Sequence, residues 1–307
     1  MPSKSNSKLS PLIRAILDTI VYADVFDYPL TKQQIHRYLT GLCAPPELVF
    51  DQLKKMGPPD GILQNIGQYT LLVGRENIVK TRVLREKVAA RLWPAALRYG
   101  KLIAGLPFVR MVAVTGSLAM NNVDENGDID YLIVTANGRL WLCRLLVLGV
   151  VWLAARERVS LCPNYLITER ALEISNHSLY AAHEFAQMVP VAGLEVYLQM
   201  RQKNPWVNDY LPNATGAPGR GNWQAENEKT SLLRRLSEKI LLTPAGTRVE
   251  AWEMRRKVRK LSLENNDNPE TLFNADICKG HSNRHGQRTE KNLNERLDQL
   301  ILKVKNE

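Results

Sequence analysis

Two apolar runs close together in the middle of the chain constrain the fold most. Residues 108–115 read FVRMVAVT and residues 128–135 read DIDYLIVT, with a polar loop between them. Aliphatic and β-branched runs of this length are typical of strands that are buried on both faces. A third run, residues 159–168 (VSLCPNYLIT), follows an apolar helical segment at residues 140–155. Strands that alternate with helices predict an α/β fold, in which helices cover a sheet.

The loop between the first two runs carries polar residues at both of its ends. The first run leads into Gly116 and Ser117, and the second begins with Asp128 and Asp130 on either side of Ile129. Alternate side chains of a strand point the same way, so both carboxylates are expected on one face. Such a pair repels unless a cation lies between its members, and oxygen ligands suit Mg²⁺ or Mn²⁺. Because a glycine lets a phosphate approach the backbone, the motif predicts a site for a metal-bound nucleoside triphosphate.

The same residues resemble the motif of the nucleotidyltransferase superfamily, which includes DNA polymerase beta, kanamycin nucleotidyltransferase and the CCA-adding enzymes. The likeness covers residues 112–134 closely, and the strand, helix, strand order up to residue 168 agrees with it. The resemblance implies a polymerase-beta-like core with a small mixed sheet, in the α/β (α+β) class. It also implies that Gly116 and Ser117 bind the triphosphate, and that the catalytic Asp128 and Asp130 hold Mg²⁺ (or Mn²⁺).

Enzymes of this superfamily usually supply a third carboxylate from a later strand. The corresponding segment, LCPNYLIT at residues 161–168, contains no Asp or Glu. Asn164 is the candidate on the strand, although a neutral side chain is a weaker metal ligand. Glu169 lies just beyond the strand, and Asp124 in the loop is a poorer candidate.

Three functions therefore stay open. The first is an Mg-dependent nucleotidyltransferase that transfers a nucleoside monophosphate from NTP to an unknown hydroxyl acceptor, either a small molecule or a nucleic acid. The second is a catalytically impaired regulator that binds nucleotide, or binds DNA through its N-terminal unit. The third is an interaction scaffold with the same fold.

The first 75 residues predict a separate small unit. Three helical segments are expected at residues 11–24, 32–41 and 45–57, with Thr31 capping the second. Residues 61–74 predict a β-hairpin that turns at Asn65-Ile66-Gly67. Three helices followed by a hairpin resemble a winged helix, which either contacts DNA or packs against a neighbouring unit.

The remaining boundaries follow from helical patterns and a linker. Residues 76–107 predict a connecting helix, bent at Pro94, and residues 108–190 form the nucleotidyltransferase core. Residues 191–307 are expected to form a helical C-terminal region, with a Gly- and Pro-rich linker near 213–224.

Some polar groups outside the motif have two interpretations each. His183 and Glu184 predict a hydrogen-bonded structural pair, or else a role near the site. His281 and His285 have the spacing of metal ligands on a helix, but glycines flank them and a solvated tail is the favoured interpretation. The basic run at residues 255–260 (RRKVRK) is either a solvated helix face or a phosphate-binding one.

Composition narrows the class of partner. The net charge of +10 favours anionic partners, namely nucleotides, nucleic acid or an anionic membrane surface. The four cysteines form no CxxC pair, so neither a zinc site nor a disulfide framework is indicated, and a cytoplasmic location is expected. The apolar segment at residues 140–155 contains Arg144 and is shorter than the roughly 20 residues that cross a bilayer. No membrane span is predicted, and the polar N-terminus does not resemble a signal peptide.

Overall fold

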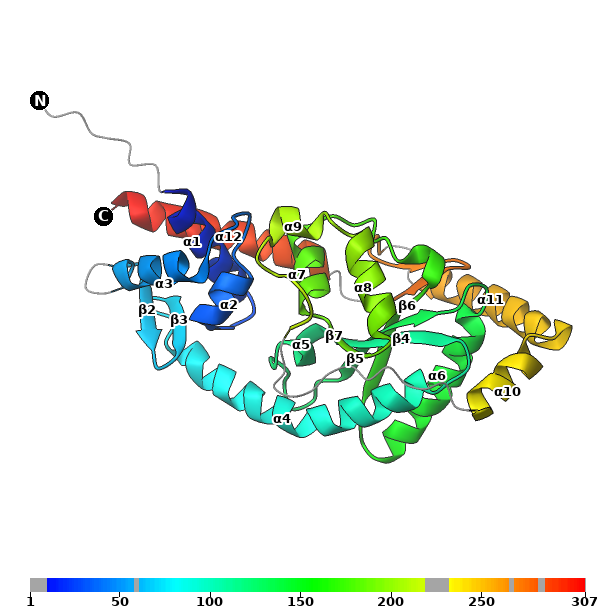
Figure 1. Ribbon diagram of the computed structural model, residues 1–307. Coiled ribbons are helices and arrows are strands. Elements are labelled where there is room, and N and C mark those ends of the chain that lie inside the picture. The colour runs from blue at the N-terminus through cyan, green and yellow to red at the C-terminus, as the bar shows by residue number, and fades with distance from the viewer. Residues whose placement is uncertain (1–9, 58–60, 219–231, 265–267, 281–284, 307) are drawn as a thin grey trace, which may run out of the picture.

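The computed structural model describes residues 10–57, 61–218, 232–264, 268–280 and 285–306 (Figure 1). The protein is a mixed α/β protein, and its larger sheet has six strands in the order β7-β4-β5-β6-β9-β8. Strand β4 pairs antiparallel with β5, and β5 pairs parallel with β6. The strands of this sheet are β4 (Val109–Thr115), β5 (Ile129–Thr135), β6 (Leu161–Thr168), β7 (Val189–Ala192), β8 (Leu272–Phe273) and β9 (Ile277–Lys279).

The three central strands match the three apolar runs, because both faces of the sheet are buried. Val112 and Val114 of β4 enter the core on one face, while Met111 and Ala113 enter the core on the other. Each strand therefore needs apolar residues at successive positions rather than at alternate ones. Strand β5 begins at Ile129, so Asp128 precedes the strand and the expectation that both aspartates lie within it is wrong.

Helices cover both faces of this sheet. The first face is covered by α4 (Asn77–Ala104), α6 (Leu140–Arg156) and α11 (Pro244–Glu264). The second is covered by α7 (Leu179–Gln187), α8 (Leu194–Lys203) and α9 (Val207–Tyr210). Helix α4 runs unbroken through Pro94 and curves beneath the sheet (Figure 1). Helix α6 is the apolar segment predicted to be buried, and among the described residues no helix is long and apolar enough to cross a membrane.

The N-terminal segment has its own small core and a three-stranded sheet in the order β1-β3-β2. Its elements are α1 (Pro11–Asp24), β1 (Leu30–Thr31), α2 (Lys32–Arg37), α3 (Pro46–Lys55), β2 (Leu63–Ile66) and β3 (Tyr69–Leu72). Thr31 and Gln34 form a capping box that starts α2 where it was predicted. Helix α2 ends at Arg37 rather than near Gly41, because the chain turns there to bury Tyr38 and Leu39. The hairpin turns at Gly67-Gln68, one to two residues later than predicted.

The C-terminal region is not only helical, which corrects the prediction for residues 191–307. It contains α10 (Leu232–Leu241), α11 and α12 (His285–Asn306), but β9 also pairs with β6 and β8 with β9. Strands of two and three residues are too short to show a hydrophobic period. The edge strand β7 was likewise missed, because Pro190 interrupts its pattern. The linker near 213–224 is described only as far as residue 218, and His281 lies outside the described residues.

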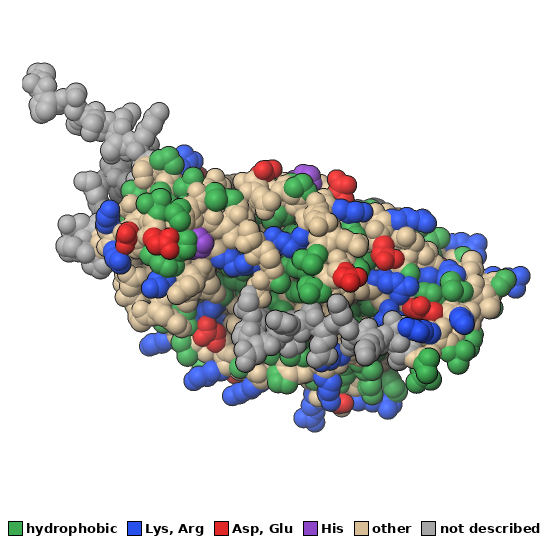
Figure 2. Space-filling model, in the orientation of Figure 1, with side chains coloured by type: hydrophobic (Ala, Val, Ile, Leu, Met, Phe, Trp, Pro, Cys, Tyr) green, Lys and Arg blue, Asp and Glu red, His purple; other side chains and the backbone are tan. Residues whose placement is uncertain are grey.

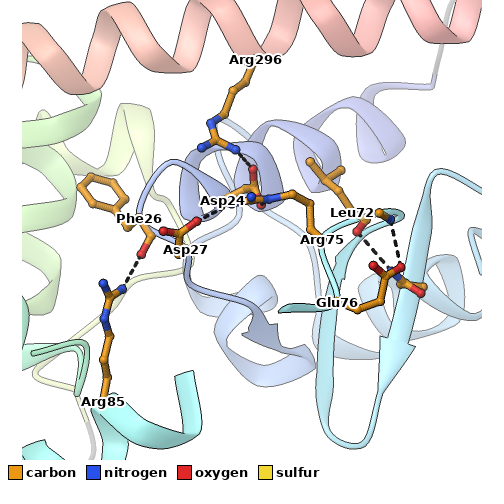
Figure 3. Close-up of polar contacts among 10 residues, drawn as sticks. Asp24, Phe26, Asp27, Leu72, Arg75, Glu76, Arg85 and Arg296 are labelled. Atoms are coloured by element: carbon orange, nitrogen blue, oxygen red, sulfur yellow. Dashed lines mark hydrogen bonds and ion pairs between the residues drawn. The ribbon is translucent and has the colours of Figure 1, made fainter. Parts of the chain in front are cut away.

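Helix α12, near the C-terminus, packs beside the N-terminal helix α1. It also packs against α7, and Arg296 forms an ion pair with Asp24 at the end of α1 (Figure 3). Arg75, which precedes α4, contacts the other oxygen of Asp24 through its Nε at 2.8 Å and also pairs with Asp27. Asp24 therefore links the N-terminal unit to α12, and Arg75 ties the end of this unit, just before α4, to the end of α1.

Candidate functional site

A cavity of about 610 Å³ lies between the sheet and the N-terminal unit. Its lining comes from the junction of β4 with the short helix α5 (Gly116–Ala119), the start of β5, strand β6, helix α7 and the segment from α1 to α2. The core residues that line it include Thr115, Gly116, Ser117, Asp128, Asp130, Cys162, Asn164, Tyr180, His183 and Glu184. The two halves of the predicted motif therefore face a single cavity.

Gly116 and Asp130 are in direct contact across the sheet. The strand register places Thr115 opposite Asp130, and Gly116 follows with a φ of +63°, in the left-handed region. A Cβ atom at position 116 would lie 2.2 Å from Oδ2 of Asp130. Glycine is required here on two counts, since other residues resist this φ and their Cβ would overlap the carboxylate.

Ser117 begins a tight turn beside the carboxylates. Its side chain is exposed, and its carbonyl oxygen accepts a hydrogen bond from the amide of Asn122 at 2.8 Å. Helix α5 (Gly116–Ala119) has only four residues, so the turn offers individual amide groups rather than the dipole of a long helix.

The two aspartates share their surroundings with a cysteine. One carboxylate oxygen of Asp128, one of Asp130 and Sγ of Cys162 all lie within 4.8 Å of one another. Burial, the neighbouring charge of Asp128 and then that of Glu184 raise the pKa of Asp130 to about 8. Among the described residues, no lysine or arginine forms an ion pair with either aspartate. The cluster therefore lacks a basic partner, and a bound cation would replace the proton that Asp130 holds at neutral pH.

Cys162 was not predicted as a site residue, and it lies opposite Asp130 on the parallel neighbour strand. Burial and the charges of Asp130 and Asp128 raise the pKa of its thiol. The signal in the sequence was its spacing of two from Asn164, because residues i and i+2 of a strand share a face.

The candidates for a third ligand are separated by the structure. Asn164 is at the site, where its Nδ2 donates a hydrogen bond of 2.7 Å to Oδ1 of Asp130. Glu169 is seven residues beyond Cys162 along β6, which places it roughly 20 Å away at the opposite end of the strand. The structure therefore does not place Glu169 in the lining of the cavity. Asp124 is exposed and pairs with Nε of Arg85 at 2.7 Å, outside the cavity lining.

Helix α7 supplies a further acid to the cavity. Glu184 is half-buried, and burial raises its pKa to about 7, against the opposing charge of Lys279. The sequence predicted that its neighbour His183 would form a hydrogen bond with it, but the structure shows no such bond. Instead, Nε2 of Gln187 donates to Nδ1 of His183 at 3.2 Å, and the imidazole stacks on Tyr22 with ring centres 3.9 Å apart. Burial lowers the pKa of His183 to about 3, so this side chain is neutral.

The N-terminal unit forms one wall of the cavity. Tyr22, Phe26, Tyr28 and Tyr38 line it, and the hydroxyl of Tyr28 donates a 2.6 Å hydrogen bond to the carbonyl of Met120. Nη1 of Arg85, on α4, donates to the carbonyl of Phe26 at 3.1 Å (Figure 3). These contacts hold an aromatic surface opposite the acidic one.

Comparisons with protein-family models, with curated proteins and with solved structures found no match to this chain. A function must therefore be argued from the geometry of the cavity and from the chemistry of its lining.

Proposed function

We propose that the protein is an Mg²⁺-dependent nucleotidyltransferase with a polymerase-beta-like core, which transfers a nucleoside monophosphate from NTP to a hydroxyl acceptor. The contact between Gly116 and Asp130 carries the proposal. It joins a turn of accessible backbone to a pair of carboxylates inside a cavity whose volume suits a small-molecule ligand. A phosphate group at the Gly116-Ser117 turn and a cation at the carboxylates would then lie next to each other.

The residues of the cluster fit a hard divalent cation. Asp128 and Asp130 offer carboxylate oxygens, whereas Cys162 offers a soft sulfur that Mg²⁺ does not prefer. A divalent cation held by the two aspartates would activate the attacking hydroxyl and stabilise charge on the leaving pyrophosphate.

The chain itself positions the reacting groups. The hydrogen bond from Asn164 orients the carboxylate of Asp130 towards the cavity. The amide groups of the Gly116-Ser117 turn are available to phosphate oxygens, since Ser117 is exposed. The third acid of the core that lines the cavity, Glu184, comes from helix α7 and not from β6. The acidic site would thus include Glu184, for which the sequence left a role near the site open.

A DNA-binding regulator is less well supported. On α3, Glu47 and Asp51 balance Lys54 and Lys55, and Nζ of Lys54 pairs with Asp51 at 2.9 Å. On α2, Arg37 donates hydrogen bonds to the carbonyls of Thr215 and Gly216. The basic residues of these two helices are therefore largely occupied, while phosphate binding needs free cations.

The test compares Asp130→Asn with the matched variant Asp124→Asn, whose aspartate is exposed in the loop that precedes β5. The readouts are the thermal shift caused by each NTP with Mg²⁺, and the release of pyrophosphate in the presence of a pool of small hydroxyl compounds. We expect Asp130→Asn to reduce pyrophosphate release at least about 100-fold, because the substitution removes a carboxylate ligand of the metal. Asp124→Asn should behave as the wild type. The proposal fails if no NTP shifts the wild type, or if release survives in Asp130→Asn.

A further inference from the structure

Helix α10 is oriented with its apolar side outwards. Its polar side faces the protein: Arg234 donates a 3.1 Å hydrogen bond to the carbonyl of Ala104, and Glu238 pairs with Nη1 of Arg110 at 3.0 Å. Oε1 of Glu238 also accepts from the amide of Phe108 at 2.7 Å. The usual arrangement of a surface helix, with apolar residues inwards, is reversed here.

The outward side of α10 is a row of large aliphatic residues. Leu232, Leu233, Leu236 and Ile240 are 81%, 80%, 57% and 61% exposed. At 100° per residue these four side chains fall within one third of the helix circumference. On the neighbouring helix α11, Trp252 is 54% exposed and carries the guanidinium of Arg256 over its ring at 5.0 Å. Large exposed apolar groups gathered in this way mark an interaction surface.

The exposed charges of α10 and α11 are almost all positive. Arg235 and Lys239 lie immediately beside the aliphatic row, one residue before Leu236 and Ile240. Glu264 is the exposed acid of these two helices, and it pairs with Nζ of Lys260 at 3.6 Å. Figure 2 shows hydrophobic and basic side chains on the visible face of this end of the molecule. The exposed basic residues of the two helices are Arg235, Lys239, Arg248, Arg255, Arg256, Arg259 and Lys260.

We propose that α10 and α11 bind the surface of an anionic lipid bilayer, with the aliphatic row of α10 inserted among the acyl chains. A helix with an apolar side, flanking cations and a nearby tryptophan has the chemistry of an interfacial helix. The basic residues are attracted to anionic headgroups, and the leucines gain from leaving water. The surface lies at the end of the molecule opposite the N-terminal unit (Figure 1), so binding there leaves that unit in place.

Two other occupants explain less of this surface. A nucleic acid matches the cations, but its phosphate backbone gives exposed leucines nothing to pack against. A second copy of the chain would match the leucines, but it would bring two sets of basic residues together. The lipid surface alone satisfies both the aliphatic row and the positive charge.

The experiment measures co-sedimentation of the full chain with vesicles. We expect binding to vesicles of phosphatidylcholine and phosphatidylserine, weak binding to phosphatidylcholine alone, and weakening by salt. Two double variants test the surface, Leu236→Ser/Ile240→Ser and Arg235→Glu/Lys239→Glu. Each should lower the affinity for anionic vesicles at least about tenfold. All four side chains are exposed, so circular dichroism melting should be unchanged. The matched control is Leu198→Ser on α8, a leucine that is 48% exposed elsewhere on the surface and should not matter.

Several outcomes would overturn the proposal. These are absence of binding to anionic vesicles, equal binding by Leu236→Ser/Ile240→Ser, or equal binding to neutral and anionic vesicles. Binding of duplex DNA without vesicle binding would assign the basic residues to nucleic acid. A dimer in size-exclusion chromatography that is lost in Leu236→Ser/Ile240→Ser, without vesicle binding, would assign the row to a second copy.

Discussion

At the scale of single residues, the contact between Gly116 and Asp130 links backbone conformation to the chemistry of the cavity. Gly138 provides a comparison, because its φ of +68° is nearly the same but its missing Cβ has no atom within 4 Å. The two glycines therefore share the backbone requirement, and the carboxylate contact belongs to Gly116 alone.

The first prediction compares Gly116→Ala with Gly138→Ala. Gly138→Ala should lose about 1–2 kcal/mol of unfolding free energy, because alanine resists a left-handed φ, and Gly116→Ala should lose more, because its Cβ also overlaps Asp130. Gly116→Ala should in addition lose the Mg²⁺-dependent thermal shift with NTP, since its Cβ displaces the Asp130 carboxylate. Urea denaturation and thermal shift measure the two effects separately. Equal NTP responses in the two variants would refute a role for this contact.

The second prediction concerns pH and His183. The imidazole is neutral in the folded state, with its pKa lowered from 6.5 to about 3 by burial. The unfolded chain takes up a proton below about pH 6.5, so the folded state loses stability as the pH falls from there towards 3. The loss approaches about 1.4 kcal/mol per pH unit.

In His183→Gln the unfolded chain has no imidazole at this position to take up a proton. Its unfolding free energy should therefore fall less steeply between pH 6.5 and pH 4. Urea denaturation at a series of pH values measures the slope. His177, which is exposed, provides the control variant His177→Gln, and its slope should match the wild type. Parallel curves for His183→Gln and the wild type would mean that His183 is charged in the folded protein.

At the scale of elements, α6 shows how tertiary contacts replace a local cap. Its N-cap residue, Arg139, makes no side-chain cap. Glu250, a buried residue of α11, instead accepts from the amides of Trp141 at 3.0 Å and Leu142 at 2.6 Å. A carboxylate at a helix N-terminus satisfies free amide groups and the helix dipole together.

The third prediction is that Glu250→Ala lowers the unfolding free energy by about 2 kcal/mol, since two buried amides lose their acceptor. Urea denaturation measures the change. Glu264→Ala removes an exposed acid from the same helix and should change stability by less than about 0.5 kcal/mol. Similar losses in the two variants would show that α6 does not depend on this cap.

At the scale of the whole molecule, Asp24 holds distant segments together. It is 3% exposed and pairs with Arg75 before α4 and with Arg296 on α12 (Figure 3). The N-terminal unit forms one wall of the cavity, so the shape of the cavity depends on the position of this unit. The ion pairs of Asp24 help to fix that position.

The fourth prediction is that Asp24→Asn lowers the unfolding free energy by about 2–3 kcal/mol, because two arginines lose a buried partner. Hydrogen exchange should also show faster exchange of the amides of α12. Asp18→Asn on α1 is the matched control, because Asp18 is partly exposed and lies 3.8 Å from Arg14 in a surface pair. Unchanged exchange in α12 would contradict the linking role of Asp24.

The central part of the fold was predictable because its signals are local. Residues 11–24 form α1 with the predicted bounds, capped by Ser10, and the apolar runs form β4, β5 and β6. The short strands β7 and β9 were not predictable, since they pair with β4 and β6, which are distant in sequence, and β8 pairs in turn with β9. The predicted pairing of His183 with Glu184 failed because His183 stacks on Tyr22 of α1, a residue far from it in sequence.

The sequence alone determined that apolar strands would bring a Gly-Ser turn near two aspartates, because strand propensity, a required glycine and a short loop act over a few residues. Tertiary packing determined which groups complete that cavity: Cys162 from the parallel neighbour, Glu184 from α7 and the aromatic wall from the N-terminal unit. Packing also determined that α10 turns its leucines outwards, since Arg234 and Glu238 are held by Ala104 and Arg110. Contacts between segments far apart along the chain depend on how whole elements fit together, and no local pattern records that fit.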